Sequence, residues 1–191
     1  MADKKPVSLC QRQKAVKPLV EDAIREHLDG ETQALALDLA AHMRENKMTL
    51  QATGIKNAWG ANYKGKKICA VRLGPGWWNE AKDAAWVVTP CLDHMDEYQG
   101  AVMEEGLQNF VWDNLFYCVH VLKGGCNSHN CAPGRDVEIL GKEIKGICRG
   151  RPPVWFHDPG KAAITAIKRL LELEQKAREE EAAAKKRKPS S

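Results

Sequence analysis

The chain has 191 residues, of which 43% are hydrophobic and 28% charged, and its formal net charge is +4. This length suits one folded domain that buries a core without covalent staples. Basic residues gather at 185–188, so the charge does not indicate a nucleic-acid surface on the folded part. The first residues lack the apolar core of a signal peptide, and no apolar run reaches the roughly 20 residues of a membrane helix. We therefore expect a cytoplasmic protein with no membrane association.

The N-terminal half predicts helices followed by strands. Residues 1–16 are polar and are predicted to be disordered. A first helix is expected to start at Pro18 and to end at Gly30, and a second to cover about 32–46. Lys64-Gly65 predicts a hairpin turn, and Cys69 alternates with apolar residues on the strand that follows.

The C-terminal half predicts one more strand, at 84–89, and then a helix over 98–115. A last helix should begin near Pro159-Gly160, and residues 175–191 are predicted to form a charged, solvated tail that is helical or disordered. The order of elements predicts an α+β fold. We expect a single domain over 17–174, with an antiparallel sheet and helices packed mainly on one of its faces.

A cysteine-rich segment at 118–148 carries the strongest chemical signal. In a reducing cytoplasm, clustered thiols indicate metal or redox chemistry more often than disulfides. The spacing predicts a hairpin with its turn at Gly141-Lys142, which places Arg135 opposite Cys148. Cys131 then lies within roughly 10 Å of Cys148, and a short loop ties Cys126 to Cys131.

These three thiolates predict a metal site that needs a fourth ligand. Cys118 is favoured because an all-thiolate site suits a structural Zn²⁺ ion, and His129 is the second choice. His120 and His157 stay open as ligands. An iron–sulfur cluster fits the same thiolates, and a redox dithiol or simple packing of the cysteines are further alternatives.

The stretches NAWGANYKGKKICAVRLG (57–74) and the cysteine-APG-hairpin-cysteine unit around ILGKEI resemble a group of small bacterial proteins of unknown function with a cysteine-rich C-terminal half. The resemblance covers roughly residues 30–173. It implies that Cys118, Cys126, Cys131 and Cys148 form one unit, and it implies no chemistry. The helical opening is also loosely similar to YdhG-like domains, as an analogy of fold alone.

Aromatic residues suggest a second kind of site. Trp59, Tyr63, Trp77 and Trp78 are candidates for a ligand-binding surface, because two adjacent tryptophans on a glycine-rich loop cannot both face a core easily. Ordinary core packing is the alternative.

Three further cysteines have simpler interpretations. Cys69 is expected in the core and Cys10 in the inert tail. Cys91 and His94 could act as nucleophile and base, but the sequence shows no third group to orient them. We thus expect a metal-stabilised domain that binds a small molecule or a protein partner. The alternative is a metalloenzyme or an iron–sulfur or thiol redox protein that uses the same cysteines.

Overall fold

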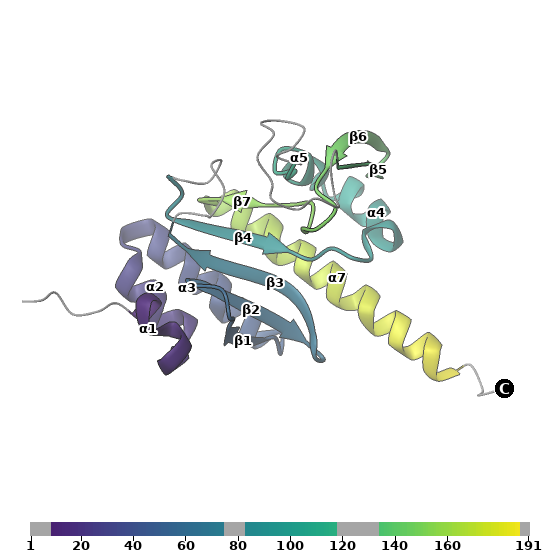
Figure 1. Cartoon of the computed structure of the whole chain (residues 1–191). Helices are drawn as coiled ribbons and strands as arrows, with labels where there is room; N and C mark the ends of the chain where they lie inside the picture. Colours follow the sequence, from purple (N-terminus) through teal and green to yellow (C-terminus); the bar gives the residue numbers. More distant parts are fainter. Residues whose placement is uncertain (1–8, 75–82, 118–133, 188–191) are drawn as a thin grey trace, which may run out of the picture. The chain divides into compact units, whose positions relative to one another are not determined.

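The computed structural model describes residues 9–74, 83–117 and 134–187. It confirms the α+β fold class, with a five-stranded antiparallel sheet in the order β1-β2-β3-β4-β7 and a separate two-stranded sheet, β5-β6 (Figure 1). The strands of the larger sheet are β1 (Thr49–Ala52), β2 (Ala58–Tyr63), β3 (Lys66–Leu73), β4 (Trp86–Pro90) and β7 (Phe156–His157). The smaller sheet pairs β5 (Arg135–Ile139) with β6 (Lys142–Ile147).

The chain groups into two compact units. The first unit comprises residues 1–88 and 157–168, and the second comprises 89–156 and 169–191. Strand β4 and helix α7 (Lys161–Arg187) each begin in the first unit and end in the second. The single domain expected over residues 17–174 stays a prediction.

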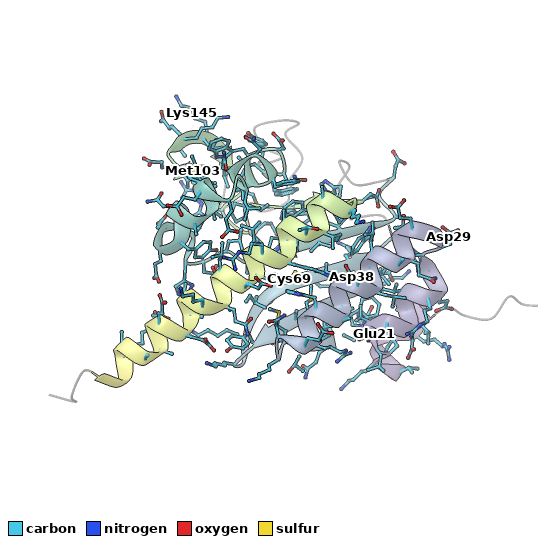
Figure 2. The ribbon with its side chains drawn as sticks, turned by 180° about the vertical axis from the view of Figure 1, so that it is seen from behind. Glu21, Asp29, Asp38, Cys69, Met103 and Lys145 are labelled. Carbon is cyan, nitrogen blue, oxygen red and sulfur yellow. The ribbon has the colours of Figure 1, made fainter. Side chains whose placement is uncertain are left out.

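Helices α2 (Val20–His27) and α3 (Gly30–Glu45) contact the sheet of the first unit, and they lie where the sequence places its first two helices. Figure 2 looks at this helical side, with Asp38 and Glu21 on the outside of the helices and Cys69 on the sheet behind them. Leu39 and Met43 of α3 are 0% exposed. Cys69 is equally buried, which confirms its predicted place in the core.

The predicted disorder of residues 1–16 is wrong for 9–16, which form helix α1 (Leu9–Val16). The reason is Gln13, a polar side chain that is only 2% exposed. Its amide donates to the Ala58 carbonyl at 2.7 Å and accepts from the Asn57 backbone N–H at 2.6 Å. Cys10 is buried on the same helix, so it does not lie in a free tail.

The hairpin between β2 and β3 is confirmed. Tyr63 pairs with Lys66 across a two-residue turn in which Lys64 and Gly65 have φ of 48° and 80°. Two positive φ values match the twist of the flanking strands, as in a type I′ turn.

In the second unit, the single helix predicted over 98–115 is replaced by two. Helix α4 (Met95–Glu104) ends and α5 (Gln108–Trp112) begins around Gly106, which has φ of 69°. Gly106 N–H donates to the Met103 carbonyl and Leu107 N–H to the Val102 carbonyl, the pattern of a Schellman C-cap.

The β5–β6 hairpin exists, but its predicted register is wrong. The turn consists of Leu140 and Gly141, with φ of 54° and 74°, so Ile139 pairs with Lys142. An irregularity between Arg135 and Val137 then places Arg135 opposite Ile147. The shift buries Leu140, which is 6% exposed, and this burial offsets the cost of a left-handed leucine.

Helix α7 starts at Lys161, close to its predicted start, and continues to Arg187, so the predicted tail takes the helical of its two expected forms over the described residues. It is not solvated throughout, because Ala177 and Arg178 are only 3% and 8% exposed. None of the described helices is both long and apolar enough to cross a membrane.

Candidate functional site

Cys148 is the one predicted cysteine ligand that the structure describes. Cys118, Cys126, Cys131 and the alternative ligand His129 lie outside the described residues, as does His120. Cys148 directly follows β6, is partly exposed and forms no disulfide with another described residue. Its backbone N–H donates to the Phe116 carbonyl at 3.4 Å.

Ile147, the neighbour of Cys148, is flanked by two other segments of the chain. It pairs with Arg135 in β5 and forms an isolated antiparallel bridge with Tyr117. Ile147 is 0% exposed, which fits its position between the two. The guanidinium of Arg149 adds a further tie, because its Nε donates to the Gly134 carbonyl at 2.9 Å.

These contacts determine the positions of the residues on either side of 118–133. Tyr117 precedes Cys118 directly, and Gly134 follows Cys131 by three residues. Both Tyr117 and Gly134 lie beside the segment Ile147–Arg149. At about 3.5 Å per residue, Cys131 can therefore lie at most roughly 10 Å from Gly134. The described part of the chain thus allows the predicted ligands to reach Cys148.

Among the described residues, no group of three or more Cys, His, Asp or Glu side chains could hold a metal ion by itself. Of the three histidines predicted as alternative ligands, His157 is described, and it lies exposed in β7 in the first unit. A metal at Cys148 would therefore need ligands from residues 118–133.

The predicted aromatic surface is described at two of its four residues. Trp59 is 0% exposed and its Nε1 donates to the Pro18 carbonyl at 3.0 Å, so its ring packs in the core. Tyr63 is 5% exposed. Both follow the packing alternative. Trp77 and Trp78 lie outside the described residues, and their ligand role stays a prediction.

The pair of Cys91 and His94 has a partner that sequence reasoning missed. Cys91 is buried, and its carbonyl accepts from Arg178 at 3.3 Å. His94 Nδ1 lies 2.9 Å from Oε1 of Glu174, and this hydrogen bond is the main reason why the pKa of His94 is raised above its ordinary value. Glu174 thus orients the imidazole, which is the role that no residue near Cys91 could be given from sequence.

Glu174 is the centre of a buried polar network in the second unit. Its carboxylate is 0% exposed and accepts from the His94 backbone N–H at 3.1 Å, from Tyr98 Oη at 2.9 Å and from Arg178 Nε at 2.7 Å. Burial, and then the neighbouring carboxylate, raise the pKa of Tyr98. Arg178 also contacts Asp93 at 3.1 Å.

This arrangement fixes α7 to the start of α4. His94 is the N-cap residue of α4, so Glu174 supplies the anion that a helix N-terminus favours. Four hydrogen-bond donors compensate the cost of burying the Glu174 carboxylate. The arrangement is that of a structural junction. The one feature of the sequence that could predict this network is the spacing of four residues between Glu174 and Arg178, because His94 lies 80 residues from Glu174.

No protein-family model, curated protein or solved structure matches this chain. The resemblance to small cysteine-rich bacterial proteins therefore stays a prediction.

Proposed function

We propose that the second unit is a cytoplasmic metal-binding module in which Cys148, with Cys118, Cys126 and Cys131, holds a structural Zn²⁺ ion. The observation that carries the proposal is the pairing of Ile147 with both Tyr117 and Arg135. It brings the residues that flank 118–133 to Ile147, the residue next to Cys148. Four thiolates are a common closed ligand set for structural zinc.

The local structure around Cys148 suits this role. The β5–β6 hairpin is short, and a two-stranded hairpin is marginal on its own in water. A metal ion that joins the hairpin to the chain before residue 118 would stabilise both, because the free energy of metal binding is coupled to folding. His129 is the alternative fourth ligand.

A second possibility is that the same thiolates serve chemistry, as a catalytic zinc site or an iron–sulfur cluster. The partial exposure of Cys148 supports this second possibility, because an open coordination position needs access from solvent. A small molecule or protein partner would then bind near the metal, or at the predicted loop that contains Trp77 and Trp78.

Elemental analysis of protein purified without air, with its visible spectrum, tests the proposal. We expect about one zinc per chain and no colour for a closed structural site. Iron with sulfide and a brown colour would replace zinc by a cluster. Protein that stays free of metal after reconstitution with zinc or with iron and sulfide would refute metal binding.

Two cysteine variants make the test specific. Cys148→Ser should lose the metal, whereas Cys69→Ser should keep it, because Cys69 lies in the core of the first unit. Both changes remove one thiol, so the metal content per folded chain separates loss of a ligand from loss of stability. Equal metal content in both variants would contradict the assignment of Cys148.

A further inference from the structure

Strand β1 has an open edge. It is the first strand of the sheet, and among the described strands it pairs with β2 alone. Leu50 pairs with Ala61 and Ala52 with Trp59, and Thr53 N–H donates to the Ala58 carbonyl next along the same register. In an antiparallel pair, the backbone N–H and C=O groups of successive residues point alternately toward the partner strand and away from it.

This alternation sets the direction of the backbone groups in β1. The Thr53 backbone N–H points toward β2, so the backbone N–H and C=O groups of Gln51 and Thr49 do so too. The corresponding groups of Leu50 and Ala52 point away from β2, toward the open edge. Within the described part of the chain, these groups of Leu50 and Ala52 have no hydrogen-bond partner. An edge of this kind is a template for a further strand.

A groove of about 340 Å³ lies along this edge. Leu50 and Ala52 form one wall, and the turn between α1 and α2 forms the other; the lining residues are Lys17, Pro18, Leu19, Leu50, Gln51 and Ala52. Leu19 is 56% exposed, although it is a large apolar side chain. The neighbouring Val16 and Ile55 are 51% and 42% exposed. Side chains on alternate residues of an added strand would cover such a surface.

One lysine lines the groove, and two more lie close to β1 in the chain. Lys17 lines it, Lys47 precedes β1 by two residues, and Lys56 follows it by four. All three are exposed, and none forms an ion pair within the described residues. A second copy of the chain added through its own β1 would bring the two sets of lysines to the same edge, and like charges there oppose pairing. An acidic strand would complement them.

We propose that the edge of β1 and its groove bind an extended acidic peptide that adds to the sheet as a further strand. The outward backbone groups of Leu50 and Ala52 supply the main-chain hydrogen bonds. The apolar residues of the peptide contact Leu19 in the groove, and its carboxylates face Lys17, Lys47 and Lys56. Strand addition of this type takes its affinity from the backbone and its specificity from alternate side chains.

The probe is a synthetic peptide of about ten residues that alternates valine and glutamate, labelled for fluorescence anisotropy. Its counterpart alternates valine and lysine. We expect saturable binding of the glutamate peptide, weakening as salt is added, and no binding of the lysine peptide. Absence of saturable binding by the glutamate peptide, or equal binding of both, would overturn the proposal.

Ala52→Pro tests the strand itself. Proline removes the outward N–H of Ala52 and leaves the hydrogen bonds between β1 and β2 intact, because edge positions of this kind tolerate proline. We expect about tenfold weaker peptide binding or more, with the circular dichroism spectrum and the melting temperature close to those of the wild type. A folded Ala52→Pro variant that binds the peptide as tightly as the wild type would refute strand addition.

Lys17→Glu tests the charges with a matched control. Reversing Lys17 should weaken binding of the glutamate peptide by about tenfold, and the same reversal at Lys66, on the hairpin between β2 and β3, should have a much smaller effect. Equal effects of the two changes would reduce the interaction to overall charge and overturn the site. Sedimentation that shows self-association lost in Ala52→Pro would instead assign the edge to a second copy.

Discussion

The Nδ1 of His94 lies 2.9 Å from Oε1 of Glu174, a carboxylate that is completely buried. The same carboxylate accepts from Tyr98 and Arg178. One side chain of α7 therefore binds both His94, which precedes α4, and Tyr98, which lies in its first turn. A buried charge of this kind is stabilising only while its partners stay in place.

Replacing Glu174 by glutamine should therefore destabilise the protein strongly. The glutamine amide would keep the shape of the side chain but remove the charge that compensates the buried guanidinium of Arg178. We expect a loss of about 3 kcal/mol in the free energy of unfolding, measured with urea. Glu180→Gln is the matched control on the same helix, since the Glu180 side chain is 65% exposed and its pair with Lys176 spans 3.9 Å. A similar loss in both variants would refute the role of the network.

The junction should also depend on pH. The hydrogen bond to Glu174, with smaller charge effects of Glu97 and Glu181, raises the pKa of His94 above 6.5 in the folded state. Below pH 6.5, the imidazole is protonated in both states and its contribution to stability is complete. As the pH rises through the folded pKa, the proton is released and this contribution is lost.

We expect the melting temperature of the wild type to fall, relative to that of His94→Gln, between pH 6.5 and the higher pKa of folded His94. The difference between the two proteins removes the effects of the other five histidines, of six in the chain. A proton NMR titration of the His94 ring gives the folded pKa independently. A constant difference across this range, or a ring that titrates below its ordinary pKa, would contradict the prediction.

The sequence predicted those parts of the fold that depend on neighbouring residues. The Lys64-Gly65 turn and a start of α7 near Pro159-Gly160 follow from local backbone preferences; the turn is confirmed, and α7 starts at Lys161, directly after Gly160. Gly106 is a readable stop signal for α4, but the apolar residues around it keep a helical spacing that favours one longer helix.

The remaining features depend on residues far apart in the chain. The register of β5–β6 is set by the burial of Leu140, which a turn preference for glycine does not reveal. Glu174 and His94 meet across 80 residues, and the bridge between Tyr117 and Ile147 also joins separate segments. A single sequence contains no signal for such pairs, so the metal ligands could be proposed but the polar network could not.

Ile147 offers a test of how the proposed metal site depends on its neighbours. Its side chain is 0% exposed and lies between Tyr117 and Arg135. Ile147→Ala should lower the free energy of unfolding by about 2–5 kcal/mol and also weaken zinc binding, because it loosens both ends of the cysteine-rich segment. Ile144→Ala, in the same strand, should cost stability without changing zinc affinity, measured by competition with a chelator. Equal zinc affinities in the two variants would contradict this dependence.

Lys47 marks a position where glycine should stabilise the fold. It has φ of 60°, and the Met48 N–H donates to the Met43 carbonyl at 2.9 Å, so Lys47 occupies the left-handed position of a C-cap that glycine normally fills. Lys47→Gly should raise the free energy of unfolding by about 0.5–1 kcal/mol, since the left-handed conformation costs lysine roughly 1–2 kcal/mol. Lys56→Gly removes the same side chain at a position without a positive φ and should bring no gain. A gain of equal size there would assign the effect to charge.

Helix α1, which composition alone places in a disordered tail, depends on one polar side chain. Gln13 joins this helix to the Asn57–Ala58 segment by two hydrogen bonds of 2.6 and 2.7 Å. Gln13→Ala leaves the Ala58 carbonyl and the Asn57 N–H without this partner, at a cost of about 1–3 kcal/mol. Helix α1 is also held by the buried Cys10 and by the Leu9 N–H, which donates to Glu26 Oε2 at 2.7 Å. Because Gln13 is the contact that joins α1 to the Asn57–Ala58 segment, we expect faster hydrogen exchange and proteolysis across residues 9–16 with the sheet unchanged. Lys14→Ala, an exposed change on the same helix, should leave both rates as in the wild type. Protection of 9–16 that survives Gln13→Ala would show that helix α1 is held by its apolar contacts instead.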